Sequence, residues 1–529
     1  MERRRFVRDL AAGLAALQLV PELAAALSDR LQALAADLAG AADDAAFWAR
    51  VRQEFLLREG LTHLNCGSIG ATPRPVVEAL VGYIQRLETD PYPYTWSGFP
   101  EAALDEVRER AGEFLGAAGD EVLITRNTTE GMNLVATAMR LQAGDEVLTT
   151  DHEHPGGVFG WLYAAEQAGA RVVQCKLPTP PSDADQIVQL IEDHLTPRTR
   201  VVMVSHVTTM TGLQMPLARI AQITRPRDIL LVCDGAQAPG MLRVYVEALG
   251  VDVYASSSHK WMLAPKGSGL LYVNRRVQDR IRPVSAWGGY QVYSASSGTR
   301  DVPHVLAHAD TMAFHQTLGL ERIEARCRQL NAYLRQRLAA IPVLELLTPA
   351  DPELSSGIVS YRLRRGSHAT VRQRLMEERD IIVKPIPGNY VFGGNPVPAE
   401  GLNALRISTH IFNSEADVDR LADALADMLG ASTAVDGDQL RPRAIDLGQN
   451  WPNPFNPSTQ IRYELPAAGP VRLEVLNARG QMVDVLVDGW QAPGAHAVTW
   501  DAGQRASGTY FYRLRAGGLE QARKMALVR

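Results

Sequence analysis

Cysteine is scarce in this chain of 529 residues, which contains only Cys66, Cys175, Cys233 and Cys327. The four are scattered without the spacing of metal ligands, so the sequence indicates neither a zinc site nor a disulfide framework. Long apolar runs are also missing, and no segment is a convincing membrane span. Lysine and arginine are dispersed in a chain of formal net charge −5, which argues against nucleic acid as a partner.

One lysine stands in a setting suited to covalent chemistry. Lys260 directly follows His259, behind a run of small hydroxyl residues and ahead of a glycine-rich apolar strand. Upstream, residues 230–237 read LLVCDGAQ, the pattern of a buried strand that ends in the carboxylate of Asp234. Ligands of α/β sheets bind at the carboxyl ends of parallel strands. A pyridoxal phosphate (PLP) enzyme needs both residues, because a lysine carries the cofactor as a Schiff base and an acid keeps its ring nitrogen protonated.

Three motifs, DGAQ at 234–237, SSSHKW at 256–261 and PKGSGLLY at 265–272, together resemble the class V aminotransferases. This PLP fold-type-I group includes cysteine desulfurases and isopenicillin N epimerase-like proteins. The resemblance covers roughly residues 61–429. It implies a three-layer αβα domain with a mainly parallel sheet, followed by a small α+β lobe. Alternating strand and helix patterns, as around 187–216, independently favour a parallel sheet.

The resemblance implies a role for each residue of these motifs. Lys260 would form the Schiff base with PLP, Asp234 would face the pyridine nitrogen, and Gln237 would reach the phenolic oxygen. Ser257 and His259 would help to hold the phosphate. Desulfurase-like relatives often carry asparagine near the position of Thr209, where it touches the phenolic oxygen, so the threonine is a departure from the pattern at a candidate contact.

A helix start after residue 125 provides a phosphate site. Asn127 followed by Glu130 is a capping-box pattern, and a helix N-terminus offers free N–H groups and a positive dipole end. The resemblance assigns the phosphate contacts to Thr128 and Thr129. The alternative is an ordinary helix cap.

Two histidines, His152 and His154, follow the next strand in a turn. Imidazole is a common metal ligand, but no carboxylate or cysteine set stands at a familiar spacing, so we expect no metal. The resemblance places a ring from this turn flat against the pyridoxal, and His154 matches that position.

The substrate side is implied by two further segments. Residues 65–70 would lie over the cofactor, which makes Asn65 a candidate substrate contact. Arg406 resembles the arginine that grips the α-carboxylate, a task suited to the planar fork of a guanidinium. The region 384–401 contains no cysteine, so desulfuration by persulfide transfer is disfavoured.

The glycine-rich loop at 287–301 looks like the one that in relatives reaches the partner subunit's phosphate, with Thr299 in that role. This implies a homodimer with shared active sites. The alternative is a surface loop.

The two ends of the chain suggest export. Arg3, Arg4 and Arg8 followed by an apolar run from Leu10 to Val20 resemble a twin-arginine signal, with small residues for cleavage at 24–26. The alternative is an amphipathic helix, because leucines continue at helical spacing at 27, 31, 34 and 38.

The C-terminal segment alternates short strands with turn residues, which predicts a small antiparallel β-sandwich. Its NPFNPST start and its GTYFYRL to KMALVR finish resemble the sorting domains of type IX secretion and their flagellar-hook-capping Ig-like relatives. We expect a periplasmic, cell-surface or secreted bacterial protein. An adhesion module is the alternative.

We therefore divide the chain into a signal (1–30), a large PLP-binding domain with a helical lead-in (31–305), a small lobe (306–430), a linker (431–445) and a sorting domain (446–529). The expected function is a PLP enzyme acting on the α-amino group or α-carbon of an amino acid, a small-molecule substrate, with aminotransferase as the leading activity. An epimerase or a C–S lyase acting on a cysteine derivative is the alternative. A surface-displayed binding protein without turnover is the alternative of another class.

Overall fold

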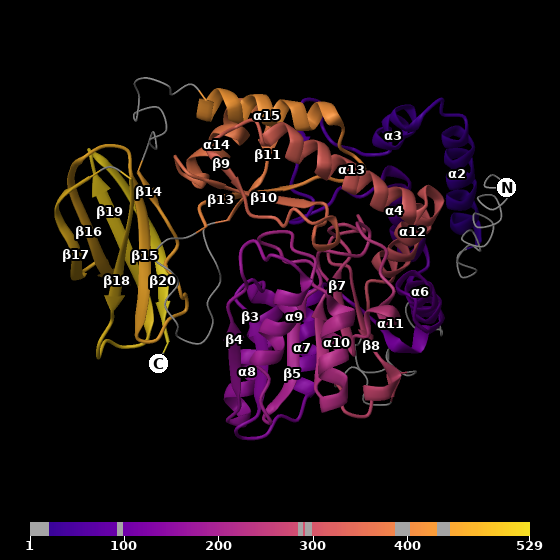
Figure 1. The fold of residues 1–529 in the computed structure, drawn as a ribbon, viewed down its shortest axis with the longest axis horizontal. Helices are drawn as coiled ribbons and strands as arrows, with labels where there is room; N and C mark the ends of the chain where they lie inside the picture. The colour runs from indigo at the N-terminus through magenta and orange to yellow at the C-terminus, as the bar shows by residue number, and fades with distance from the viewer. Residues whose placement is uncertain are drawn as a thin grey trace. The chain divides into compact units, whose positions relative to one another are not determined.

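The computed structural model describes residues 21–92, 99–283, 289–290, 299–386, 402–430, 445–492 and 494–528 (Figure 1). The chain forms two compact units. The first comprises the described residues of Met1–Arg364 and Leu375–Ala426, and the second those of Arg365–Arg374 and Asp427–Arg529. The helices of the described ranges lack the length and apolar character that crossing a membrane requires.

A seven-stranded sheet forms the centre of the first unit, in the order β2-β8-β7-β6-β5-β3-β4. Strand β8 runs antiparallel to both of its neighbours, and the other pairs are parallel. This confirms the predicted mainly parallel α/β fold. The strands are β2 (Val122–Thr125), β3 (Glu146–Thr150), β4 (Arg171–Cys175), β5 (Thr199–Ser205), β6 (Leu230–Asp234), β7 (Val253–Ser257) and β8 (Gly269–Val273).

Helices cover this sheet because its central strands are apolar on both faces. Every residue of β6 and of β7 is buried, as expected for parallel strands between helical layers. Helices α7, α8 and α10 pack against strands of the sheet (Figure 1). The helices of this part are α4 (Arg74–Thr89), α6 (Phe99–Leu115), α7 (Thr128–Ala138), α8 (Pro155–Ala168), α9 (Ala184–Asp193), α10 (Leu217–Thr224), α11 (Val246–Leu249) and α12 (Val302–Leu318).

Two helices precede this domain, α2 (Pro21–Ala39) and α3 (Asp44–Gln53). The leucines at helical spacing in α2 are buried in the main core and pack near α4 and α12, so residues 21–39 have the structure of the alternative interpretation, an amphipathic helix. Residues 1–20, which carry the arginines and the apolar run of the expected signal, lie outside the described residues.

The small lobe is built on a four-stranded antiparallel sheet in the order β12-β13-β10-β9. A short parallel pair, β1 with β11, joins the segment that precedes α4 to this lobe. The elements are β1 (Thr62–His63), α13 (Leu320–Leu338), β9 (Leu344–Leu346), β10 (Ile358–Leu363), α14 (His368–Arg379), β11 (Ile381–Ile382), β12 (Lys384–Ile386), β13 (Ala404–Ser408) and α15 (Glu415–Gly430).

The C-terminal region forms two antiparallel sheets around one apolar core, as predicted. Alternate residues of β15 are buried, which is the pattern of a strand with one face on a core. One sheet has the order β14-β15-β18 and the other β17-β16-β19-β20. The strands are β14 (Asp446–Leu447), β15 (Ser458–Leu465), β16 (Gly469–Asn477), β17 (Met482–Gln491), β18 (Gly494–Asp501), β19 (Gly508–Ala516) and β20 (Leu519–Leu527).

Candidate active site

A cavity of about 310 Å³ opens at the carboxyl edge of the large sheet. Ser205, Asp234 and Ser257 are the last residues of β5, β6 and β7, and all three line it. These strands run parallel, so their ends meet at one edge, where α/β sheets bind ligands. Most of the predicted site residues gather here: Thr128, Thr129, His154, Thr209, Asp234, Gln237, Ser257, His259 and Lys260.

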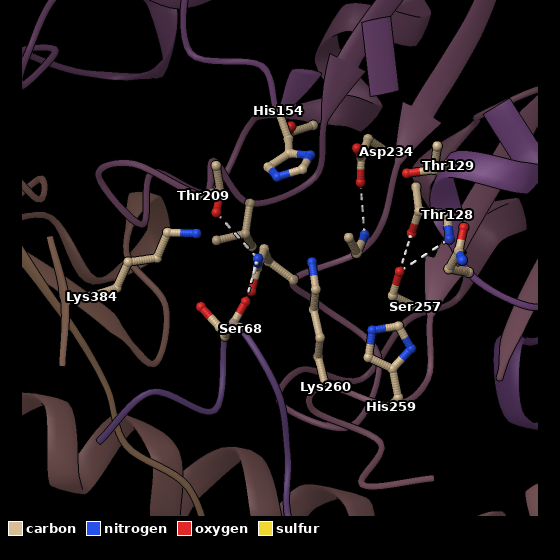
Figure 2. A pocket seen from close by; sticks show the side chains of 16 residues that line it. Ser68, Thr128, Thr129, His154, Thr209, Asp234, Ser257, His259, Lys260 and Lys384 are labelled. Atoms are coloured by element: carbon tan, nitrogen blue, oxygen red, sulfur yellow. Dashed lines mark hydrogen bonds between the residues drawn. The ribbon is translucent and has the colours of Figure 1, made fainter. Parts of the chain in front are cut away.

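Lys260 extends its amine into this cavity (Figure 2). Removal from water lowers the pKa of its ammonium group to about 8. The carboxylate of Asp234 opposes this decrease, and the charges of Arg406 and Lys384 add to it. A substantial fraction of Lys260 is therefore neutral near pH 8, as a nucleophile or base must be.

Asp234 is buried, with 4% of its surface exposed. Its Oδ1 accepts a hydrogen bond from the Ala236 N–H at 2.9 Å, while burial raises its pKa and the charge of Lys260 lowers it. Helix α8 passes so close that a Cβ on Gly157 would lie 2.7 Å from Asp234 Oδ2. The carboxylate is thus held tightly at the end of its strand.

The first turn of α7 forms another part of the cavity wall. Asn127 caps the helix, because its Oδ1 accepts from the Glu130 N–H at 2.9 Å. In the usual capping box the acid accepts from the N–H of the cap residue itself. Here Glu130 Oε2 accepts from the N–H of the preceding residue, Arg126, at 2.6 Å. Ser257 Oγ lies 3.0 Å from Thr128 N and 2.9 Å from Thr128 Oγ1.

This wall suits an anion. The first N–H groups of a helix have no carbonyl partner within the helix, and the hydroxyls of Thr128 and Ser257 stand beside them. His259 Nδ1 is buried and has no hydrogen-bond partner among the residues described. A phosphate bound at this helix N-terminus would give the His259 ring nitrogen the hydrogen-bond partner that it lacks.

His154 lies across the pocket from Lys260 (Figure 2). It caps α8, with Nδ1 accepting from the Gly156 N–H at 3.1 Å. Desolvation, helped by the charges of Lys260, Lys384 and Arg406, lowers its pKa to about 4, so the ring is neutral at pH 7. His152 does not line the cavity, and its Nε2 instead pairs with Thr179 Oγ1 at 3.0 Å.

The predicted carboxylate-binding arginine lies immediately behind the cavity lining. Arg406 is fully buried on β13. Its Nη1 donates to the carbonyl and hydroxyl oxygens of Thr209, at 3.1 and 2.8 Å. Its Nη2 donates to Asn65 Oδ1 and to Ser68 Oγ, each at 2.9 Å. Thr209 and Ser68 line the cavity, whereas Asn65 contacts the arginine from the side.

The amide of Gln237 is oriented by three neighbours. Its Oε1 accepts from Trp261 Nε1 at 2.7 Å, and its Nε2 donates to the Gly67 carbonyl at 2.9 Å and approaches Thr209 Oγ1 at 3.3 Å. Thr209 Oγ1 therefore accepts hydrogen bonds from both Arg406 and Gln237. The hydrogen of the Thr209 hydroxyl group can therefore be donated to another acceptor, such as the phenolic oxygen of PLP.

Thr299 is not part of this cavity. It is exposed and borders a second cavity of about 620 Å³ with Arg300, Asp301 and His304. Most of the loop at 287–301 lies outside the described residues, so its role toward a partner subunit stays a prediction.

Three residues at the site escaped the sequence reasoning. Lys384 lines the cavity from β12, although its surroundings read only as a short strand. Ser68 joins it from the loop after β1. Buried Glu153 accepts from Thr150 Oγ1 at 2.7 Å and Ser205 Oγ at 2.6 Å, and burial followed by the charge of Asp234 raises its pKa to about 7. Two of the three had a signal in the sequence: Ser68 belongs to the segment expected over the cofactor, and Glu153 is an acid between two histidines at a strand end.

A family model described as "Aminotransferase class-V" matches residues 70–421, which is more than half of the chain. The chain belongs to this family. Class V aminotransferases of this type depend on PLP, and the cavity supplies the groups the cofactor requires: a lysine with lowered pKa, a buried acid, a neutral ring and a phosphate cradle at α7. The protein is therefore a PLP-dependent enzyme of fold type I.

Relatives within the class V family carry different activities. Isopenicillin N epimerase of Streptomyces clavuligerus is 33% identical over 403 residues, covering 72% of this chain and 98% of the relative. The enzyme of the same name from Amycolatopsis lactamdurans is 34% identical with the same coverage. Cysteine desulfurase of Haloferax volcanii is 28% identical over 387 residues, covering 69% of this chain and 88% of the relative.

Solved structures agree with the fold of this class V enzyme. A variant of C-DES with glycine covalently linked to its PLP cofactor matches with a TM-score of 0.63 at 25% identity, covering 71% of this chain and 99% of C-DES. The apo cysteine desulfurase of Thermococcus onnurineus NA1 matches with a TM-score of 0.62 at 22% identity, covering 72% and 98%.

Proposed function

We propose that this enzyme acts at the α-carbon of an amino acid and that transamination is its leading reaction. The observation that carries the proposal is the position of Lys260, whose amine enters a cavity with a buried acid on one side and an arginine-backed wall on another. When bound, PLP supplies the electron sink for negative charge at the α-carbon.

Each residue has a role in this proposal. Lys260 would hold the cofactor and, as a neutral amine, would remove the α-proton of the substrate. Asp234 keeps a proton on the pyridine nitrogen. His154 covers the ring as a neutral imidazole. Arg406, with Asn65 beside it, orients the α-carboxylate.

The remaining residues position the cofactor. Thr128, Thr129, Ser257 and His259 bind the phosphate. Thr209 donates to the phenolic oxygen, and Gln237 reaches that oxygen with the N–H that otherwise approaches Thr209 Oγ1.

Epimerisation is the second candidate. It is favoured by the two isopenicillin N epimerases, which are 33% and 34% identical and match over nearly their whole length. A C–S lyase reaction would use the same first steps on a cysteine derivative. Persulfide transfer to the protein is disfavoured, because residues 384–401 contain no cysteine and all four cysteines of the chain are buried.

Proton NMR in heavy water tests the proposal. The PLP-loaded protein is incubated with a panel of L-amino acids and cysteine conjugates, each with and without a 2-oxo acid. We expect α-proton exchange, with a new oxo acid only when the acceptor is present. Racemised product would instead establish the epimerase, and pyruvate without acceptor the lyase. No exchange across the panel would contradict the proposal and favour a binding protein.

We also propose export and sorting to the periplasm, the cell surface or the medium. The twin-arginine pattern and the NPFNPST and KMALVR motifs support it. Locating the full chain in a bacterium with type IX secretion tests it, beside a variant without residues 446–529 and an R3K/R4K variant. N-terminal sequencing then tests cleavage at 24–26, which would remove buried Ala24 and the start of α2.

We further propose a homodimer in which Thr299 reaches the phosphate of the partner's site. Its exposure beside the second cavity supports an intermolecular role. Mixing Lys260→Ala chains with Thr299→Ala chains tests sharing, because a mixed dimer would contain one complete site. Recovered cofactor absorbance and activity are expected, and no recovery would contradict shared sites.

A further inference from the structure

A second lysine reaches the same cavity from the small lobe. Lys384 begins β12 and lies opposite Arg406 in the antiparallel pair of β12 with β13. Its side chain lines the cavity, and its amine points inward near Thr209, from a different side than Lys260 (Figure 2). The strand pairing therefore places two cations on the small-lobe side of the cavity: Lys384 lines it directly, and Arg406 lies behind Thr209 and Ser68.

The charge of Lys384 is not compensated by the protein part that the structure describes. No carboxylate within the described ranges pairs with its amine, and the influences on its pKa are desolvation first and then the positive charge of Arg406. Both lower the pKa, which falls to about 8. A partly buried ammonium beside a guanidinium is costly without a counter-ion. A bound anion would remove that cost.

The acids near the site serve other partners. Asp234 lies at the end of β6 beside Lys260 and accepts from the Ala236 N–H. Glu153 is enclosed by the hydroxyls of Thr150 and Ser205. Lys384 therefore faces the cavity with Arg406 behind the lining, and a substrate with one carboxylate leaves one of these two positive charges without a counter-ion.

We infer that Lys384 binds a second anionic group of the substrate, so that the site accepts α-amino acids whose side chain ends in a carboxylate. The inference rests on the proposed function for the α-carboxylate, which Arg406 orients. Lys384 then holds the side-chain carboxylate through a charge-assisted hydrogen bond. Lys384 is thus a specificity-determining residue for acidic substrates, and Lys260 remains the base.

Binding of dicarboxylic acids to the PLP-loaded full chain tests this directly. Malonate, succinate and glutarate carry no amine and cannot react, and propionate and butyrate serve as monocarboxylates of similar size. Calorimetry should show that at least one dicarboxylate binds roughly tenfold or more tightly than its monocarboxylate counterpart, as expected for one additional charge-assisted contact. Equal binding of the two classes would overturn the inference.

Variants identify the cation responsible. Lys384→Met should reduce the dicarboxylate preference to within about threefold, and Lys384→Arg should keep most of it. Lys384→Gln provides a second neutral variant should the methionine variant fold poorly, which the melting temperature and the cofactor absorbance reveal. Lys266→Met is the matched control, because Lys266 is an exposed lysine outside this cavity that donates to Thr72 Oγ1. A preference that persists in both neutral variants would overturn the inference.

The outcomes separate this inference from the proposed function. A dicarboxylate preference that Lys384→Met removes, together with no α-proton exchange for any amino acid, supports the anion site and contradicts the proposed function. Exchange without any dicarboxylate preference contradicts the anion site alone. Lys384→Met could instead lower α-proton exchange equally for acidic and neutral amino acids and leave every dissociation constant unchanged. That result would show that Lys384 acts as an acid or base, and it would overturn the inference.

Discussion

The chemistry of individual residues is set by how little water reaches them. Lys260 and His154 face each other across one cavity, and desolvation is the largest cause of the lowered pKa of each. The consequence is a site in which the amine is neutral at moderately alkaline pH and the imidazole is neutral throughout the physiological range. Both can then contact a cofactor that carries its own charges.

Capture of PLP by the apo-protein should depend on pH through Lys260. Its ammonium form cannot attack, so below a pKa of about 8 the rate should rise about tenfold per pH unit, and above that pH it should level off. Stopped-flow absorbance between pH 6 and 10 measures the rate. Lys260→Ala should show no visible absorption band of bound cofactor while keeping its melting temperature. An unchanged spectrum would disprove the assignment of the lysine.

The ring at His154 should matter for its flat surface and not for its charge. Because the pKa is about 4, His154→Phe should hold PLP within about twofold of the native protein at pH 7. His154→Ala should release PLP about two- to thirteenfold faster, since aromatic stacking contributes about 0.5–1.5 kcal/mol. Dissociation into excess phosphate buffer, followed by absorbance, measures both. Faster release from the phenylalanine variant than from the alanine variant would contradict stacking.

At the scale of elements, the site is a product of strand ends and helix starts. The parallel strands β5, β6 and β7 deliver one side chain each to the same edge, and α7 and α8 begin beside them. The turns that join strand to helix therefore carry most of the cofactor contacts, while the strands themselves serve the core.

The cap of α7 should contribute to stability and cofactor binding together. Asn127→Ala removes the acceptor for the Glu130 N–H and should cost about 1 kcal/mol of unfolding free energy. It should also weaken PLP binding severalfold, because Asn127 lines the cavity. Asp183→Ala is the matched control: Asp183 caps α9 in the same way, with Oδ1 2.8 Å from Gln186 N, but does not line the cavity. Urea titration should show a similar loss of stability in both variants. PLP titration should show weakened binding only in Asn127→Ala.

At the scale of the whole molecule, the chain combines an enzyme with a C-terminal β-domain that has its own core. Trp500 lies at the centre of that core, with its ring 5.5 Å from Phe455 and 5.4 Å from Tyr510, and Nε1 donates to Asp484 Oδ2 at 3.0 Å. Separate cores imply that the two parts can lose stability separately.

Truncation of Trp500 should therefore destabilise the β-domain alone. Trp500→Ala should cost about 3–5 kcal/mol through the cavity it leaves. Differential scanning calorimetry should show one transition at lower temperature and the other unchanged, with the absorbance of bound PLP retained. Loss of cofactor at temperatures below the enzyme transition would show that the β-domain supports the active site.

The sequence alone determined the parts of the site that depend on neighbours along the chain. Lys260 after His259, Asp234 at the end of an apolar strand and Asn127 at a helix start are local patterns, because strand ends and caps are properties of a few consecutive residues. The mainly parallel sheet and the antiparallel C-terminal sheets also followed from periodicity and turn residues.

Only the tertiary structure decided which distant residues share the substrate wall. Arg406 meets Asn65 and Thr209 across 341 and 197 positions of sequence, and Lys384 reaches the cavity because β12 pairs with β13. Neither contact has a local signature, since a lysine or an arginine on a short strand reads as a surface residue until packing buries it. The direction of a side chain into a cavity is fixed by the register of the sheet and by the elements that close over it.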